Sequence, residues 1–146
     1  MERNLEPEYV AVDPTGTTAL VTLQEANALA VVDIASARVT DVRPMGAKSW
    51  EQFALDSSKE DEQARTFGGL PIEAMLQPDA IEPFASGGET FYVTANEGDH
   101  KGGSRGFTIW NRDGTVVHES GPAFEHELIR IGHYPEKRSD KKGVEP

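Results

Sequence analysis

The sequence predicts an all-β protein built from four-stranded antiparallel blades of a partial β-propeller, with one short helix near its C-terminal end. The first observation behind this prediction is an internal repeat. Pro7 and Pro78 lie 71 positions apart, and Val21-Thr22 and Val93-Thr94 lie 72 positions apart. The second is that turn sequences divide each copy into four short segments rich in β-branched and aromatic residues. Four short antiparallel strands in about 40 residues form the unit of a propeller blade.

Each copy contains four predicted strands. In the first copy they cover residues 9–12, 18–23, 28–34 and 38–42. In the second copy they cover residues 80–84, 90–95, 106–110 and 115–119. Asp13-Pro14-Thr15-Gly16 is a typical turn sequence, and Asp113-Gly114 suits a hairpin loop with positive φ. A β-sandwich of eight strands is the alternative, because periodicity alone does not separate it from two blades. The repeat favours the blades.

These elements divide the chain into four parts: a first blade (1–46), a long connecting insertion (47–75), a second blade (76–122) and a final segment (123–146). In the final segment, apolar residues at 124, 128 and 131 predict a short helix over 124–131, followed by a mobile tail. Val144-Glu145-Pro146 repeats the pattern of Leu5-Glu6-Pro7, which indicates the start of a third repeat.

Composition limits the partners. The 25 acidic and 14 basic residues give a net charge of −11, so nucleic-acid phosphates and anionic membranes would repel the chain. The absence of cysteine excludes disulfides, thiolate zinc sites and cysteine nucleophiles. The longest apolar stretch, residues 28–32, is too short to span a bilayer, and the first residues lack the apolar core of a signal peptide. We therefore expect no nucleic-acid partner, no membrane insertion and no organic cofactor.

Acidic residues recur at matching places in the two copies. Glu8 corresponds to Asp79 and Glu25 to Glu97, with Asp99 close by in the second motif. Equivalent positions of successive blades lie around one axis, so these carboxylates are expected to converge. Converging carboxylates raise one another's pKa or recruit a cation, and an all-oxygen set suits calcium or magnesium. The sequence thus predicts a hard-cation site made by Glu8, Glu25, Asp79, Glu97 and Asp99. The alternative is that they are solvated turn residues.

Other chemistry has less support. The four histidines lack the i, i+4 spacing of a metalloprotease, and no serine lies in a Gly-x-Ser-x-Gly elbow. Residues 98–106 are rich in glycine and include Lys101 and Arg105, which could cradle a phosphate. They do not match a P-loop, and a connection between strands explains them more simply. No catalytic residue is predicted.

Five stretches of the chain carry a resemblance to a known family. They are residues 4–9, 21–28, 77–81, 93–99 and 138–146. In this order they resemble the propeller domain of the choice-of-anchor I family, which includes the mesenchyme-specific cell-surface glycoproteins. The resemblance implies a YVTN-type, seven-bladed propeller that is extracellular, periplasmic or attached to the cell surface. This chain looks like two consecutive blades of it, with a shorter connection between Asp99 and Arg105 than the family usually has.

The predicted function is an extracellular binding or interaction module whose acidic mouth is organised by a hard cation. Its partner would be a protein or a small phosphorylated ligand. Some family members carry phosphatase or phytase-like labels, so a metal-dependent phosphoesterase is one alternative; a structural fragment without its own activity is another. Two blades do not close a ring, so the end faces must be buried by further copies in a homo-oligomer or by the remainder of a larger propeller.

Overall fold

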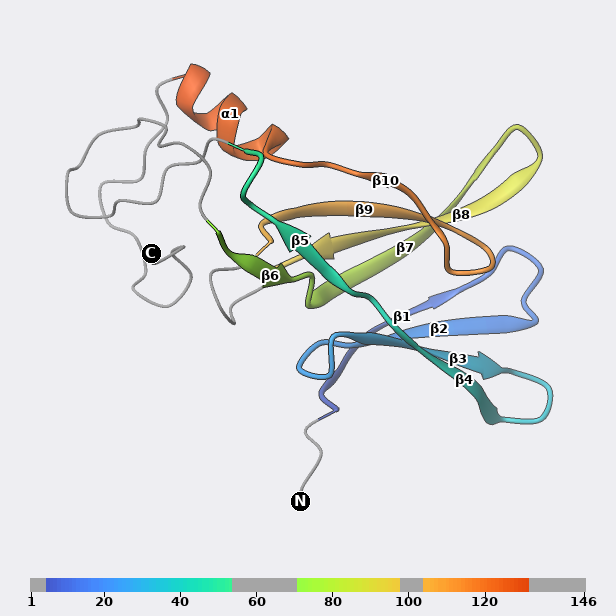
Figure 1. The fold of residues 1–146 in the computed structure, drawn as a ribbon. Helices are drawn as coiled ribbons and strands as arrows, with labels where there is room; N and C mark the ends of the chain where they lie inside the picture. Colours follow the sequence, from blue (N-terminus) through green and yellow to red (C-terminus); the bar gives the residue numbers. More distant parts are fainter. Residues whose placement is uncertain (1–4, 54–70, 98–103, 132–146) are drawn as a thin grey trace.

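Two four-stranded antiparallel sheets make up most of the structure, a computed structural model that describes residues 5–53, 71–97 and 104–131 (Figure 1). The first sheet has the order β1-β2-β3-β4, with strands β1 (Pro7–Val12), β2 (Thr18–Leu23), β3 (Ala28–Asp33) and β4 (Arg38–Pro44). The second consists in chain order of β7 (Pro78–Ser86), β8 (Glu89–Asn96), β9 (Gly106–Asn111) and β10 (Val116–Glu119). In each sheet, chain neighbours pair with one another. The predicted all-β fold with sheets of the propeller-blade type is confirmed.

The connecting segment contains a small sheet that the sequence did not predict. Strands β5 (Ala47–Ser49) and β6 (Glu73–Met75) pair antiparallel, with Lys48 opposite Ala74. Helix α1 (Ala123–Arg130) follows β10 and confirms the predicted short helix to within one residue at each end. The predicted mobile tail and third repeat lie outside the described residues, as does most of the long insertion.

The core lies between the two four-stranded sheets. The first sheet contributes Ala11, Leu20, Leu29 and Val31, and the second contributes Ile81, Tyr92 and Trp110. Cross-strand pairing explains this grouping, because Ala11 lies opposite Leu20 and Leu20 opposite Val31, so all three point to one face. Strands β1 and β7 also lie beside each other. The first strand of each sheet is therefore innermost, as in blades arranged around an axis.

A chain of buried polar side chains runs through the core face of the second sheet. The Trp110 indole N–H donates to the Thr94 hydroxyl at 3.0 Å, and that hydroxyl donates to Asn96 Oδ1 at 2.9 Å. The Asn96 amide then donates to the Thr108 hydroxyl at 2.8 Å. All four residues are buried. Because each of these four side chains has a hydrogen-bond partner in the network, their polar atoms lie in the core at a reduced desolvation cost.

The turn between β1 and β2 is closed by Asp13, which is 3% exposed. Its carboxylate accepts hydrogen bonds from the backbone N–H groups of Thr17 and Thr18 and from the Thr15 hydroxyl. Arg112, in the loop between β9 and β10, lies 3.2 Å from the same carboxylate and ties the two sheets together. Burial alone would raise the pKa of Asp13, but the hydrogen bonds and the Arg112 charge outweigh it and hold the pKa below its usual value.

This lowered pKa predicts a loss of stability in acid. Ionised Asp13 stabilises the fold fully above its ordinary pKa of 3.8, and this contribution is lost as the pH falls through the lower folded-state value. In urea unfolding between about pH 6 and pH 2, the wild type should lose more stability below about pH 4 than Asp13→Asn. Asp33, whose pKa is also lowered by hydrogen bonds from Ser36, is present in both proteins and cancels in the comparison. Parallel pH profiles for the two proteins would contradict the assignment.

Candidate functional site

Equivalent positions of the two sheets meet at the end of the molecule where β1 and β7 begin and β2 and β8 end. Glu6 and Gln77, immediately before β1 and β7, both have left-handed backbones, with φ of 42° and 44°. The Glu6 carbonyl accepts a hydrogen bond from the Gln24 N–H, and the Gln77 carbonyl accepts one from the Glu97 N–H, each at 3.1 Å. The two copies thus share the same backbone geometry here, which supports the repeat seen in the sequence.

This geometry changes which residues correspond. Because Pro7 pairs with Leu23 and Pro78 with Asn96, the counterpart of Glu97 is Gln24, at a spacing of 73. The repeat in the sequence aligns Glu97 with Glu25 at a spacing of 72, and this predicted pairing is wrong by one residue. Glu25 lies exposed in the turn after β2.

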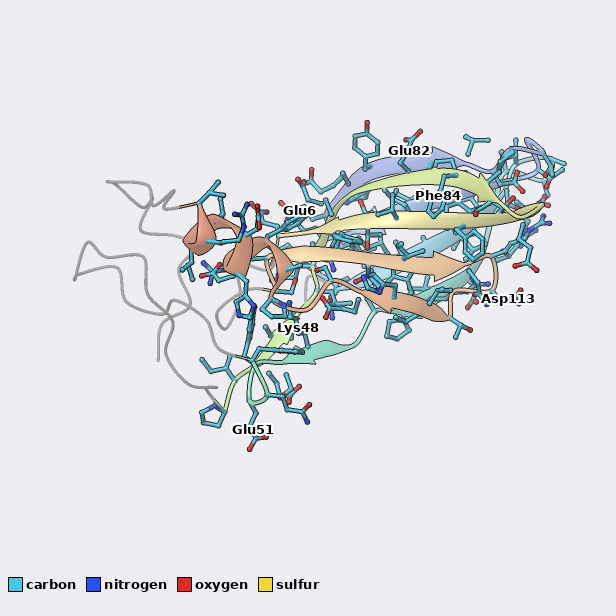
Figure 2. The ribbon with its side chains drawn as sticks, turned by 90° about the horizontal axis from the view of Figure 1, so that it is seen from above. Glu6, Lys48, Glu51, Glu82, Phe84 and Asp113 are labelled. Carbon is cyan, nitrogen blue, oxygen red and sulfur yellow. The ribbon has the colours of Figure 1, made fainter. Side chains whose placement is uncertain are left out.

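The two true counterparts touch. The Gln24 amide donates to the Glu97 carboxylate at 2.6 Å, across the boundary between the sheets. Both side chains are half-buried. Figure 2 shows Glu6 and Lys48 toward this end of the sheets and Asp113 at the opposite end. Gln24 and Glu97 thus converge from equivalent positions of the two sheets, although the sequence did not predict this pair. We call Gln24, Asn27, Gln77 and Glu97 the mouth junction.

Asn27 holds the mouth junction together and was missed in the sequence analysis. Its side-chain amide donates to the Gly46 carbonyl at 2.6 Å, and its Oδ1 accepts from the Gln77 N–H at 2.8 Å. Its backbone is left-handed, with φ of 48°, a conformation that asparagine adopts more readily than most residues. The signal available in the sequence was an asparagine at the tip of the turn between two apolar strands.

The other predicted cation ligands lie around this end without forming a compact group. Glu8 on β1 and Asp79 on β7 are exposed, and the Asp79 backbone carbonyl accepts a bond from the Thr22 hydroxyl at 3.4 Å. Asp99 lies outside the described residues. Within the described ranges, no three histidine, aspartate or glutamate side chains are close enough together to hold a metal ion. The five-residue cation site thus stays a prediction.

A buried lysine is the other unusual feature, and sequence reasoning did not single it out. The Lys48 side chain on β5 is 2% exposed, and its ammonium lies 3.3 Å from the Glu119 carboxylate. It donates to the carbonyls of Ser104 at 3.0 Å and Gly121 at 2.6 Å, and it lies 4.1 Å from the centre of the Trp50 ring. Burial lowers the pKa of Lys48, and the Glu119 charge partly offsets this.

The contacts of Lys48 indicate a structural role. An ammonium has three protons, and three acceptors surround this one. The lysine thereby joins the small β5–β6 sheet to the segments on both sides of β9 and β10. Beside it lies a cleft of about 370 Å³ whose walls include Met45, Phe53, Leu76 and Val116, with Lys48 and Glu119 as charged members. A second ion pair, Arg105 with Glu125 of α1 at 3.2 Å, ties the helix to the start of β9.

Comparison with known proteins gives two kinds of result. A search of curated proteins returned no match. Among solved structures, hydrazine synthase of Kuenenia stuttgartiensis is 13% identical, with a TM-score of 0.34 over 81% of this chain and 36% of that one. The dihydro-heme d1 dehydrogenase NirN in complex with DHE is 11% identical, with a TM-score of 0.25 over 75% of this chain and 36% of that one. The chain thus spans about a third of the length of either protein.

Two further findings bear on identity. No helix within the described ranges is long and apolar enough to cross a membrane. The family model of the choice-of-anchor I domain matches residues 1–102, which include the first sheet, the small sheet, β7, β8 and all four members of the mouth junction. The chain belongs to the choice-of-anchor I domain family.

Proposed function

We propose that this chain is the binding part of an extracellular β-propeller module and that its ligand binds at the mouth junction. Choice-of-anchor domains are typically found at the cell surface or outside the cell. The observation that carries the proposal is the contact between Gln24 and Glu97, which brings side chains from equivalent positions of two sheets to one point. Ligands of folds with radial repeats are bound at such points, because loops and strand ends from several repeats converge there.

The chemistry of the junction suits a hard cation. The Glu97 carboxylate and the Gln24 amide oxygen are donors of the kind that calcium and magnesium accept. The exposed carboxylates of Glu8, Glu25 and Asp79 add negative charge at the same end of the sheets. Calcium takes about 6–8 oxygen ligands, so the remaining ones would come from water or from the bound partner. A protein carboxylate or a small phosphorylated ligand would complete such a site.

Calcium titration of the melting temperature tests this proposal. The wild-type Tm should rise by several degrees at a calcium concentration of about 100 times Kd, which corresponds to about 2.7 kcal/mol. Glu97→Gln should abolish the rise, because the amide removes the half-buried negative charge. Glu89→Gln is the matched control, since Glu89 is exposed at the start of β8, at the opposite end of the strand. A wild-type Tm that does not change with calcium, or an equal rise of the Tm in Glu97→Gln, would rule out the cation site.

The same samples separate the binding module from a metal-dependent phosphoesterase. A generic phosphomonoester is incubated with each protein in calcium and then in chelator. Turnover that requires the metal and disappears in Glu97→Gln would show that the chain is an enzyme rather than a binding module. A calcium-dependent Tm without turnover supports the binding module. If calcium changes neither the Tm nor the turnover, the chain is a structural module without its own activity.

A further inference from the structure

The outer face of the first sheet is entirely apolar. Cross-strand pairing puts the following residues on the face that points away from the second sheet: Val10, Val12, Ala19, Val21, Leu23, Ala28, Ala30, Val32, Val39, Val42 and Pro44. Four of them are about half exposed, with exposed fractions of 56% for Val10, 48% for Val12, 61% for Val39 and 53% for Val42. Four others on the same face, Ala19, Leu23, Ala28 and Ala30, are already buried. A continuous apolar face of this kind on a folded protein marks an interaction surface.

The outer face of the second sheet is also largely apolar, but its side chains are larger. Pairing places on it Ala80, Glu82, Phe84, Phe91, Val93, Ala95, Phe107, Ile109 and His118. The rings of Phe84 and Phe91 stack at 5.6 Å, and Phe124 of α1 packs against Phe107 at 5.6 Å. A hollow of about 250 Å³ lies over Val93, Ala95, Phe107 and Phe124.

We infer that these two faces bind each other between copies of the chain, head to tail. The outer face of the second sheet of one copy covers the outer face of the first sheet of the next. The inference does not depend on the proposed ligand site, because the faces lie along the sheets and the mouth junction lies at their end. It commits to a second copy as the occupant of each face.

The internal interface supplies the argument. Equivalent residues of the first strands, β1 and β7, are 71 positions apart, and those of the second strands, β2 and β8, are 73 positions apart. Val10 is therefore the counterpart of Ile81, and Ala19 is the counterpart of Tyr92. Ile81 is 1% exposed and Tyr92 1% exposed, because the first sheet covers them within the chain. Of their two counterparts, Ala19 is already buried, but Val10 is 56% exposed. A second copy that stacks as the first sheet does on the second would bury Val10 in the same way.

The two outer faces are also complementary in size. The first sheet presents small aliphatic side chains, mostly alanine and valine, and the second presents phenylalanines around a hollow. Inside the chain, aliphatic residues of the first sheet, two of them leucines, likewise meet Tyr92 and Trp110. Because the two faces differ, the contact is heterologous and continues from copy to copy until a ring closes. Three copies would bring six four-stranded sheets together, two from each chain.

A mixing experiment with two variants tests the pairing. Val10→Lys places a charge on the first face, and Val93→Lys places one on the second, where Glu82 lies directly opposite and can pair with it. The solution mass is measured by light scattering across roughly a thousandfold range of concentration. The wild type should give a multiple of 15.9 kDa, and each variant alone should be a monomer. An equimolar mixture should give a heterodimer, because each variant keeps the face that the other needs.

Glu51→Lys is the control, since Glu51 is exposed in the turn after β5 and belongs to neither large sheet. It should assemble as the wild type does. Circular dichroism checks that the variants are folded; if one is not, Val12→Lys or Phe84→Lys replaces it on the same face. A wild type that is monomeric at every concentration overturns the inference, and so do variants that assemble normally. A mixture that stays monomeric would exclude the head-to-tail arrangement. A loss of calcium binding would leave these masses unchanged, so the two proposals fail separately.

Discussion

Replacing Lys48 by methionine is expected to lower the free energy of unfolding by about 2–4 kcal/mol. Methionine keeps an apolar side chain of similar length but removes the ammonium, and with it the contact with the Trp50 ring. The carbonyls of Ser104 and Gly121 then lose their donor, and the Glu119 carboxylate loses its ion-pair partner. Breaking a buried pair by removing one member is costly because the other member stays desolvated. Urea unfolding followed by tryptophan fluorescence measures the change.

Two companion variants isolate the cause. Lys48→Met with Glu119→Gln removes the orphaned charge, so the double variant should recover part of the loss, and the remainder is due to the two carbonyls. Arg130→Ala breaks the exposed pair with Glu127 on α1, whose side chains are 69% and 57% exposed, and should leave stability unchanged. If Lys48→Met were as stable as Arg130→Ala, Lys48 would not be the structural link described above.

Thr94→Val is expected to lower the free energy of unfolding by about 2–3 kcal/mol although it keeps the shape of the side chain. The hydroxyl accepts from the Trp110 indole and donates to Asn96, so valine leaves a buried donor and a buried acceptor without partners. Such groups lose their water on folding and gain nothing in return. Thermal unfolding of the variant should give a lower Tm with the same cooperativity.

Thr94→Ser is the matched control for this network. Serine keeps the hydroxyl and loses only a methyl group, which should cost about 1 kcal/mol. The order of stability should thus be wild type, then serine, then valine. If valine were more stable than serine, packing rather than hydrogen bonding would hold this part of the core.

The eight long strands were predictable because local chemistry marks both their interiors and their ends. Asp13 closes its turn through its own side chain, and Gly114 adopts the positive φ of 77° expected for the Asp-Gly loop. Strands β5 and β6 were not predictable, because three residues are too few to show a period of two. Their pairing depends on contacts between residues 24 or more positions apart.

The candidate site was predictable only in part. The repeat correctly indicated that equivalent positions meet, but the shared Val-Thr pair gave the wrong register. Thr22 and Thr94 both point into the space between the two sheets, one from each side, so they are not equivalent by rotation. A slip of one residue moves a side chain to the other face of a sheet, and register irregularities at the starts of β1 and β7 hide the slip in the sequence. Lys48 was missed because its acceptors lie 56 and 73 positions away.

The small β5–β6 sheet gives the chain a natural point for insertion. Ser49 pairs with Glu73, and the Trp50 N–H donates to the Ile72 carbonyl at 3.0 Å, so the chain leaves and returns at adjacent positions. The two ends of the segment between them are held in this way. The free-energy cost of closing that segment then depends only weakly on its length, because each doubling adds about 0.6 kcal/mol. A tag, an epitope or a whole folded domain could therefore be spliced in between residues 53 and 71, while the registers of both large sheets stay as they are.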